Sequence, residues 1–173
     1  MSVGVMQMYN IGDLVIYSSH GVCRIDSICE KTYSGITRTY YVIHPIEDAG
    51  LTISAPVDKE QDIMQKLIDR NEAEEVLQSF QSPGVEWIEK NHDRTKKYSD
   101  IINTGDRKEI SRIISTIMRK KHEVESNGKK LGESDRKLLL STQNILFQEL
   151  SISLDTTFDA IVKEVNRLMN LKD

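Results

Sequence analysis

The side chains best suited to chemistry in this sequence are a single tryptophan and the cations that follow it. Trp87 comes just after a Ser-Pro-Gly break at 82–84 and precedes a polar segment that carries Arg94 and Lys97. An exposed aromatic ring beside cations can stack on nucleic-acid bases or wedge between them. Alternatively, Trp87 packs inward between helices, and the sequence leaves both interpretations open.

Basic side chains gather in the same part of the chain. The net charge is −6 over residues 1–80, +4 over 81–137 and −2 over 138–173, within a total of −4. Acidic neighbours dilute the basic excess, so we expect DNA binding that is weak, salt-sensitive and largely independent of base sequence. Helix faces and turns are where phosphate contacts are expected, and the candidates there are Arg94, Lys97, Arg107, Lys108, Arg112, Lys129 and Lys130.

No signature of an enzyme or a metal centre accompanies these residues. The sequence lacks a dinucleotide-binding GxGxxG, a P-loop, an HExxH and a GxSxG motif. Cys23 and Cys29 have no further ligands at metal-site spacing, and we expect two reduced thiols on the same face of one strand. We therefore predict a non-catalytic protein without a metal or another cofactor.

The chain also lacks features that would place it in or across a membrane. No apolar run approaches the roughly 20 residues that cross a bilayer. Residues 1–7 lack the basic and apolar segments of a secretory signal. We expect a cytoplasmic protein without a membrane contact. The patterned sequence begins just after Met8, which is therefore an alternative start.

The elements that must position these residues change type near Pro56. Residues 9–57 contain short apolar segments separated by turns, including a hairpin turn at 33–36, and predict four or five strands of a small curved barrel, SH3-like or Tudor-like. The strands expected are 14–17, 22–30, 39–43 and 51–55. Residues 58–173 predict about five helices, including a polar helix over 85–102. The predicted fold is α+β, with a β domain over 1–57 and a helical domain over 58–173.

The chain resembles the CarD/CdnL family of transcription regulators, whose first module also occurs in the transcription-repair coupling factor. The resemblance covers nearly the whole chain from Tyr9 on. In the helical half it rests on Gly105-Asp106 with the apolar helix that follows, and on the helix over 138–150. In the first half it rests on Asn10-Ile11-Gly12-Asp13-Leu14-Val15-Ile16-Tyr17, on His20-Gly21-Val22, on Tyr40-Tyr41-Val42-Ile43 and on Leu51-Thr52-Ile53-Ser54-Ala55-Pro56-Val57.

This resemblance implies a Tudor-like domain that binds the β subunit of RNA polymerase. The contacts that it implies are Lys31, Arg38, Thr52, Ser54 and Pro56. Lys31 matches a basic position of the family, whereas Ser54 stands where some relatives have an arginine. Pairing with a second copy through an exposed edge strand stays open, although we expect a monomer.

The resemblance further implies a helical domain that contacts promoter DNA at the upstream edge of the transcription bubble and stabilises the open complex. Family members wedge a tryptophan into the minor groove there, and Trp87 is the candidate for this role. Asn91 falls nearer to the place where the family pattern has its tryptophan, and is a second candidate DNA contact. The alternative function is a protein–protein adaptor whose β module binds another partner and whose helices do not touch DNA.

Overall fold

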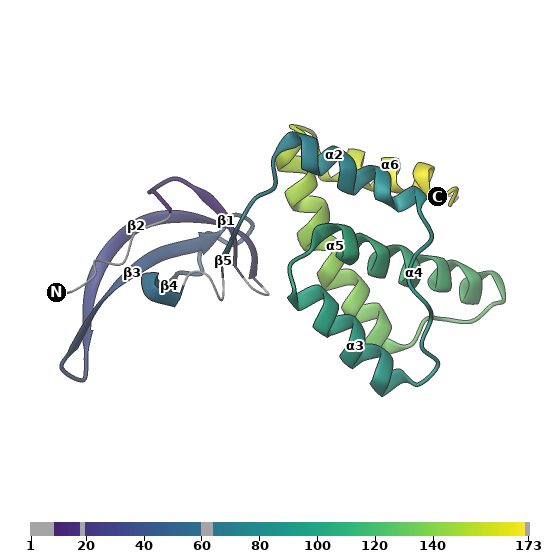
Figure 1. Cartoon of the computed structure of the whole chain (residues 1–173), viewed down its shortest axis with the longest axis horizontal. Helices are drawn as coiled ribbons and strands as arrows, with labels where there is room; N and C mark the ends of the chain where they lie inside the picture. Colours follow the sequence, from purple (N-terminus) through teal and green to yellow (C-terminus); the bar gives the residue numbers. More distant parts are fainter. Residues whose placement is uncertain (1–8, 18–19, 60–63, 172–173) are drawn as a thin grey trace. The chain divides into compact units, whose positions relative to one another are not determined.

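The computed structural model describes residues 9–17, 20–59 and 64–171, and the chain divides into two compact units, Met1–Leu67 and Ile68–Asp173 (Figure 1). In the described ranges, an antiparallel sheet of five strands is followed by five α-helices. The predicted α+β fold, with a Tudor-like β module before a helical module, is confirmed. Met8, the alternative start, lies outside the described residues.

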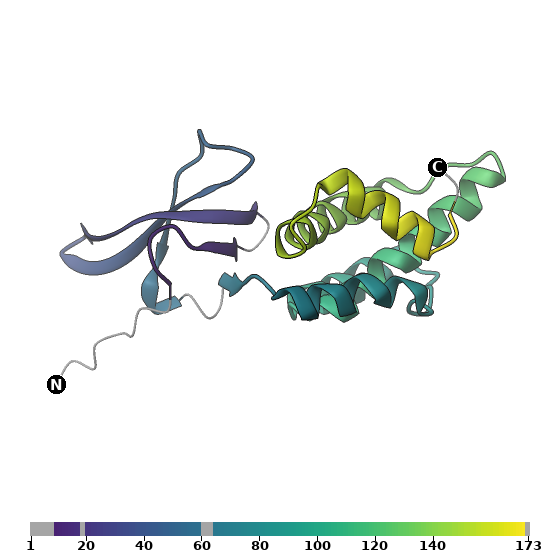
Figure 2. The same cartoon turned by 90° about the horizontal axis from the view of Figure 1, so that it is seen from above.

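The sheet of the first unit has the order β4-β3-β2-β1-β5. Its core contains Val15, Ile25, Tyr41, Ile43 and Ala55, all with side chains withdrawn from solvent. Figures 1 and 2 show β2 and β3 as a long, curved hairpin. The strands are β1 (Leu14–Tyr17), β2 (Gly21–Tyr33), β3 (Ile36–Pro45), β4 (Ile53–Pro56) and β5 (Met64–Lys66).

The hairpin of β2 and β3 turns through Ser34 and Gly35, as the sequence predicts. Tyr33 pairs with Ile36, and the two turn residues have φ angles of 51° and 77°. Positive φ at both central residues is the geometry of a type I′ turn, whose twist matches that of the strands. Tight pairing therefore continues to the tip of the hairpin.

A bulge in β2 separates the two cysteines. The register with β3 shifts between Ile25 and Ser27. Cys23 is fully buried before the bulge, whereas beyond it Ile28 contacts the core and Cys29 is half-buried. The expectation that both thiols share one face is wrong, because a bulge inserts one residue and reverses the alternation of side chains.

The sequence led us to expect only helices after Pro56, but the segment that follows it is not helical throughout. A short 3-10 turn, η2 (Val57–Lys59), precedes β5, which pairs antiparallel with β1. The first unit therefore extends to Leu67, past the predicted domain end at Val57. A three-residue strand is too short to show a periodicity of its own.

The second unit packs five helices around one core, which includes Phe80, Ile113, Phe147, Leu150 and Val165. The central helices α4 and α5 contact each other, and α3 contacts both. Figures 1 and 2 show α2 and α6 along the side of this unit opposite to α3. The helices are α2 (Arg70–Gln78), α3 (Asn91–Asn103), α4 (Arg107–Ser126), α5 (Glu133–Ser153) and α6 (Phe158–Leu168), with the 3-10 turn η3 (Ser79–Gln81) after α2. No helix in the described ranges is long and apolar enough to span a bilayer.

The chain enters the helical unit at Ile68, whose peptide groups are held by α5. The Ile68 N–H donates to Oε2 of Glu149 at 3.1 Å, and the Ser153 hydroxyl donates to the Ile68 carbonyl at 2.7 Å. Glu149 is 2% exposed and also accepts two hydrogen bonds from Arg107, at 3.0 and 2.9 Å. These three donors stabilise a carboxylate that would be costly to bury alone. Asp69 then caps α2 by accepting from the N–H of Glu72.

Candidate functional site

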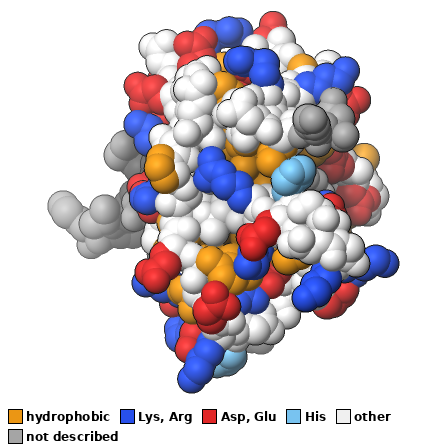
Figure 3. Space-filling view, turned by 90° about the vertical axis from the view of Figure 1, so that its right-hand side faces the viewer, with side chains coloured by type: hydrophobic (Ala, Val, Ile, Leu, Met, Phe, Trp, Pro, Cys, Tyr) orange, Lys and Arg blue, Asp and Glu red, His pale blue; other side chains and the backbone are white. Residues whose placement is uncertain are grey.

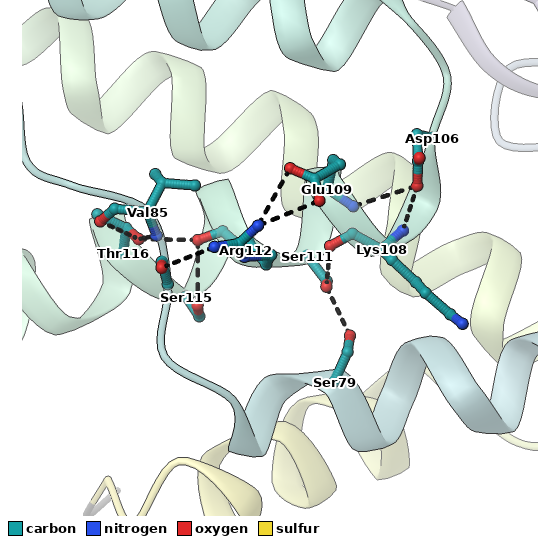
Figure 4. Close-up of polar contacts among 10 residues, drawn as sticks. Ser79, Val85, Asp106, Lys108, Glu109, Ser111, Arg112, Ser115 and Thr116 are labelled. Carbon is teal, nitrogen blue, oxygen red and sulfur yellow. Dashed lines mark hydrogen bonds and ion pairs between the residues drawn. The ribbon is translucent and has the colours of Figure 1, made fainter.

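Trp87 lies in a loop over residues 82–90 that precedes α3. The prediction of a helix over 85–102 placed the start too early, since the helix begins at Asn91. The loop is pressed onto α4 at Gly84, where an added Cβ would lie 2.0 Å from Oγ1 of Thr116. The Val85 N–H donates to the same oxygen at 2.8 Å, and the Thr116 hydroxyl donates to the Arg112 carbonyl at 2.8 Å (Figure 4). Contacts with α4 thus determine where the loop carries Trp87.

Arg94 fixes the other side of this loop from the interior of the unit. It is 6% exposed, and its Nε and Nη2 donate to the two carboxylate oxygens of Asp135 on α5 at 2.8 and 2.6 Å. Its Nη1 donates to the carbonyls of Ile88 and Glu89, and Nη2 also donates to Oδ1 of Asn91. All five guanidinium N–H groups therefore have acceptors inside the protein.

The indole of Trp87 is half-buried among these groups. The guanidinium carbon of Arg94 lies 4.1 Å from the ring centroid, and the Lys120 ammonium lies 5.3 Å from it. Both distances suit cation–π attraction. Tyr98 meets the indole edge-on at 6.5 Å, and its hydroxyl donates to the Glu86 carbonyl. Burial raises the pKa of Tyr98, so the phenol keeps its proton and remains a donor.

A hollow of about 210 Å³ opens beside the ring, between the loop and the C-terminal half of α4. It is lined by Gly84, Val85 and Thr116 and, on its aromatic side, by Trp87. Its remaining lining residues are Arg119, Lys120 and Glu123, all on α4. The hollow therefore combines an aromatic surface, two cations and one carboxylate.

Two of the predicted DNA contacts are turned inward. Arg94 is committed to Asp135, and Arg107, with a side chain 11% exposed, is committed to Glu149. A phosphate contact through either guanidinium would break a buried ion pair, which is costly. We assign both arginines a structural role, because their donors hold helices together.

The remaining predicted DNA contacts are at the surface but do not form one cluster. Asn91 is exposed at the start of α3 and accepts a hydrogen bond from Arg94, the arginine that lies against the Trp87 ring. Lys97 is exposed on the same helix. Arg112 is partly exposed, contacts Glu109 and donates to the Gly84 carbonyl. Lys108 is exposed at the first turn of α4, where its hydrogen bond to Glu75 raises the pKa of the lysine.

The last two predicted contacts, Lys129 and Lys130, are exposed beyond the C-terminal end of α4. Because an α-helix rises about 1.5 Å per residue, the 20-residue α4 separates them from Lys108 by roughly 30 Å. Figure 3 likewise shows Lys and Arg side chains interspersed with acidic and hydrophobic ones on one face. This distribution suits a few separate phosphate contacts.

Three residues beside Trp87 are absent from the predicted contacts: Arg119, Lys120 and Glu123. Together with Thr116 they occupy one face of α4, at the spacing of successive helical turns. This periodicity is readable in the sequence. Their proximity to Trp87 is not, because it depends on the contacts of the loop with α4.

The predicted polymerase contacts gather in the first unit around β4, which is an edge of the sheet in the described ranges. Lys31 donates to Oγ of Ser54 at 2.7 Å and pairs across the β2–β3 ladder with Arg38. Thr52 is exposed just before β4, and Pro56 pairs with Tyr40 at its end. The five predicted residues thus come from β2, β3 and the edge strand.

Neither unit offers a metal centre in the part of the chain that the structure describes, where no group of three or more His, Cys, Asp or Glu side chains could hold an ion. Burial raises the pKa of the Cys23 thiol to about 11, which makes it a poor nucleophile at neutral pH. The two surfaces described above are the candidate sites.

Comparison with known proteins places both units in one family. The family model described as "CarD-like/TRCF RID domain" matches residues 9–68, and the one described as "CarD, C-terminal domain" matches residues 75–166. The chain is also 27% identical over 146 residues to YdeB of Bacillus subtilis (strain 168), a proposed transcription factor, with 84% of this chain and 92% of that protein covered. The two models together span nearly all described residues, and the chain belongs to the CarD family.

Proposed function

We propose that this protein is a transcription regulator that binds the β subunit of RNA polymerase through its sheet and stabilises the promoter open complex through its helical unit. Membership of the CarD family and the similarity to YdeB support the regulatory role. In this proposal the surface around Lys31 and Ser54 contacts polymerase, and the Trp87 loop contacts DNA at the upstream edge of the bubble. The protein acts by binding, without a catalytic step.

The observation that carries the DNA contact is the way in which Trp87 is held. A half-buried indole flanked by the Arg94 guanidinium and the Lys120 ammonium is fixed in a loop clamped to α4. A rigid aromatic side chain loses little conformational freedom when it meets a base step. Because Arg94 already neutralises Asp135, phosphate attraction falls to the partly exposed cations nearby, Arg119 and Lys120.

The DNA contact is tested by the lifetime of open complexes on a weak promoter. Trp87→Ala is expected to shorten this lifetime roughly tenfold, the scale of one lost aromatic–base contact, while polymerase binding stays unchanged. Trp87→Phe keeps an aromatic ring in the loop and is expected to lose less. An unchanged lifetime with Trp87→Ala, in protein that circular dichroism shows to be folded, refutes the assignment.

The polymerase contact is tested by charge reversal on β2. Lys31→Glu is expected to weaken binding to core polymerase at least about tenfold, because it breaks the bond to Ser54 and repels an acidic partner surface. Arg24→Glu is the matched control, since Arg24 is exposed on the same strand about 23 Å away. Equal affinity of both variants contradicts the assignment.

A second function, an adaptor that does not touch DNA, is favoured by the packing of Trp87 against the helical core. In that case Trp87→Ala lowers the stability of the helical unit and leaves the open-complex lifetime of the folded fraction unchanged. The same lifetime measurement, combined with an unfolding curve, therefore separates the two functions.

A further inference from the structure

The hollow beside Trp87 has room for a small planar group. Its volume is about 210 Å³. A water molecule in the liquid occupies about 30 Å³, and pockets for larger ligands begin at roughly 300 Å³. The hollow is therefore large enough to seat one planar ring system of nucleobase size against the indole.

The cations at the rim of the hollow suit a phosphate group. Lys120 is partly exposed, with its Nζ 5.3 Å from the Trp87 ring centroid and 3.7 Å from the Glu123 carboxylate. Arg119 makes one long hydrogen bond, at 3.4 Å, to the Ser82 carbonyl. In contrast to Arg94, neither cation is held in a buried ion pair. An aromatic wall next to such cations is the combination that binds single-stranded nucleic acid.

Glu123 gives the hollow a basis for choosing among bases. Its side chain is 64% exposed and lines the hollow. A carboxylate accepts hydrogen bonds from the exocyclic amino group of cytosine or adenine, whereas thymine presents a carbonyl at the corresponding position, which the carboxylate repels. The same carboxylate would disfavour a second phosphate in the hollow.

We propose that this hollow binds one unpaired nucleotide of a DNA single strand, with the base against Trp87 and the phosphate at Arg119 and Lys120. Glu123 makes cytosine or adenine preferred over thymine. A base within a duplex cannot enter, because its edge is paired and its faces are stacked. This inference rests on the proposed function, since the opened promoter supplies the unpaired strand.

The test uses the emission of Trp87, the sole tryptophan of the chain, in the full-length protein. The protein is titrated at low salt with single-stranded oligo-dC, oligo-dT, the oligo-dC:oligo-dG duplex and cytidine monophosphate. We expect oligo-dC to change the emission and to bind roughly tenfold more tightly than oligo-dT. The duplex is expected to leave the emission unchanged, and the monophosphate to bind more weakly than oligo-dC because it offers a single phosphate.

Matched variants on α4 identify the residues responsible. Glu123→Gln is expected to abolish the preference for oligo-dC over oligo-dT, whereas Glu125→Gln, the same change at an exposed position outside the hollow, preserves it. Lys120→Gln is expected to lower the salt dependence of oligo-dC binding by about 0.7 in the logarithmic slope, as one lost phosphate contact predicts. The control for this change is the exposed neighbour Lys121→Gln.

Three results overturn the proposal: equal binding of oligo-dC and duplex, equal behaviour of Glu123→Gln and Glu125→Gln, or tighter binding of the free monophosphate. The last would make the hollow a site for a free nucleotide. If any of these results is found while Trp87→Ala still shortens the open-complex lifetime, nucleotide binding in the hollow is refuted and the proposed function stands. If the lifetime is also unchanged, both fail.

Discussion

Arg94→Met removes the guanidinium around which the Trp87 loop is organised, and its cost can be worked out from the contacts of that group. Asp135, with a side chain 6% exposed, would stay buried without its cation, and the carbonyls of Ile88 and Glu89 would lose their donor. Removing one member of a buried ion pair costs about 3–5 kcal/mol. This is a large part of the roughly 5–15 kcal/mol that stabilises a typical domain.

Two further variants separate the stability of the unit from the position of Trp87. In the double variant Arg94→Met, Asp135→Leu, no charge is left buried, so we expect most of the lost stability to return. The indole still lacks its cation at 4.1 Å, so its emission stays altered. Arg107→Met breaks the comparable pair with Glu149 and is expected to lower stability without changing the emission of Trp87 in the folded protein.

The assay is urea unfolding followed by circular dichroism, with the emission maximum and acrylamide quenching of Trp87 recorded in the native state. A loss of less than about 1 kcal/mol in Arg94→Met would contradict the reasoning, since such a value is typical of an exposed ion pair. Wild-type emission and quenching in the double variant would show that Arg94 does not hold Trp87.

Three other predictions follow from the packing. Gly84→Ala is expected to displace the Trp87 loop, because the new Cβ would lie 2.0 Å from Thr116 Oγ1. The displacement should increase acrylamide quenching of Trp87 emission, and unchanged quenching would contradict it. At pH 8, Ellman's reagent is expected to modify the half-buried Cys29 readily and Cys23 only after unfolding, because burial raises the pKa of Cys23 to about 11. This folded-state pKa exceeds the ordinary value of 9.0. The contribution of the buried Cys23 thiol to stability is therefore complete below pH 9 and is lost as the pH rises toward 11. The stabilities of wild type and Cys23→Ala, measured by unfolding at alkaline pH, should therefore converge over that range.

Much of the fold could be predicted because its signals are local. The strands before Pro56 are short apolar segments separated by turns, and α4 carries an apolar stripe that includes Ile113 and Ile117. The turn at Ser34 and Gly35 could be predicted because glycine and small polar residues favour tight turns. By contrast, β5 is three residues long and is defined by pairing with β1.

The candidate site could be predicted only in part, because its geometry depends on distant residues. Trp87 and its basic surroundings are visible in the sequence. The burial of Arg94 is not, since Asp135 follows it by 41 residues, and neither is the clamp on the loop, where Thr116 follows Val85 by 31 residues. An arginine on a polar helix gives no local sign of whether it meets solvent or a carboxylate.

The attachment of Ile68 to α5 determines how a pulling force would pass into the helical unit. Tension applied to the chain at Leu67 would reach the bonds from Ile68 to Glu149 and Ser153 before it reached α2. Glu149 is tied in turn to Arg107 at the start of α4, so the load would be shared between the two central helices. A load that enters the helical unit through this segment would therefore be anchored in the interior of the unit, and the first turn of α2 would be shielded from being unwound.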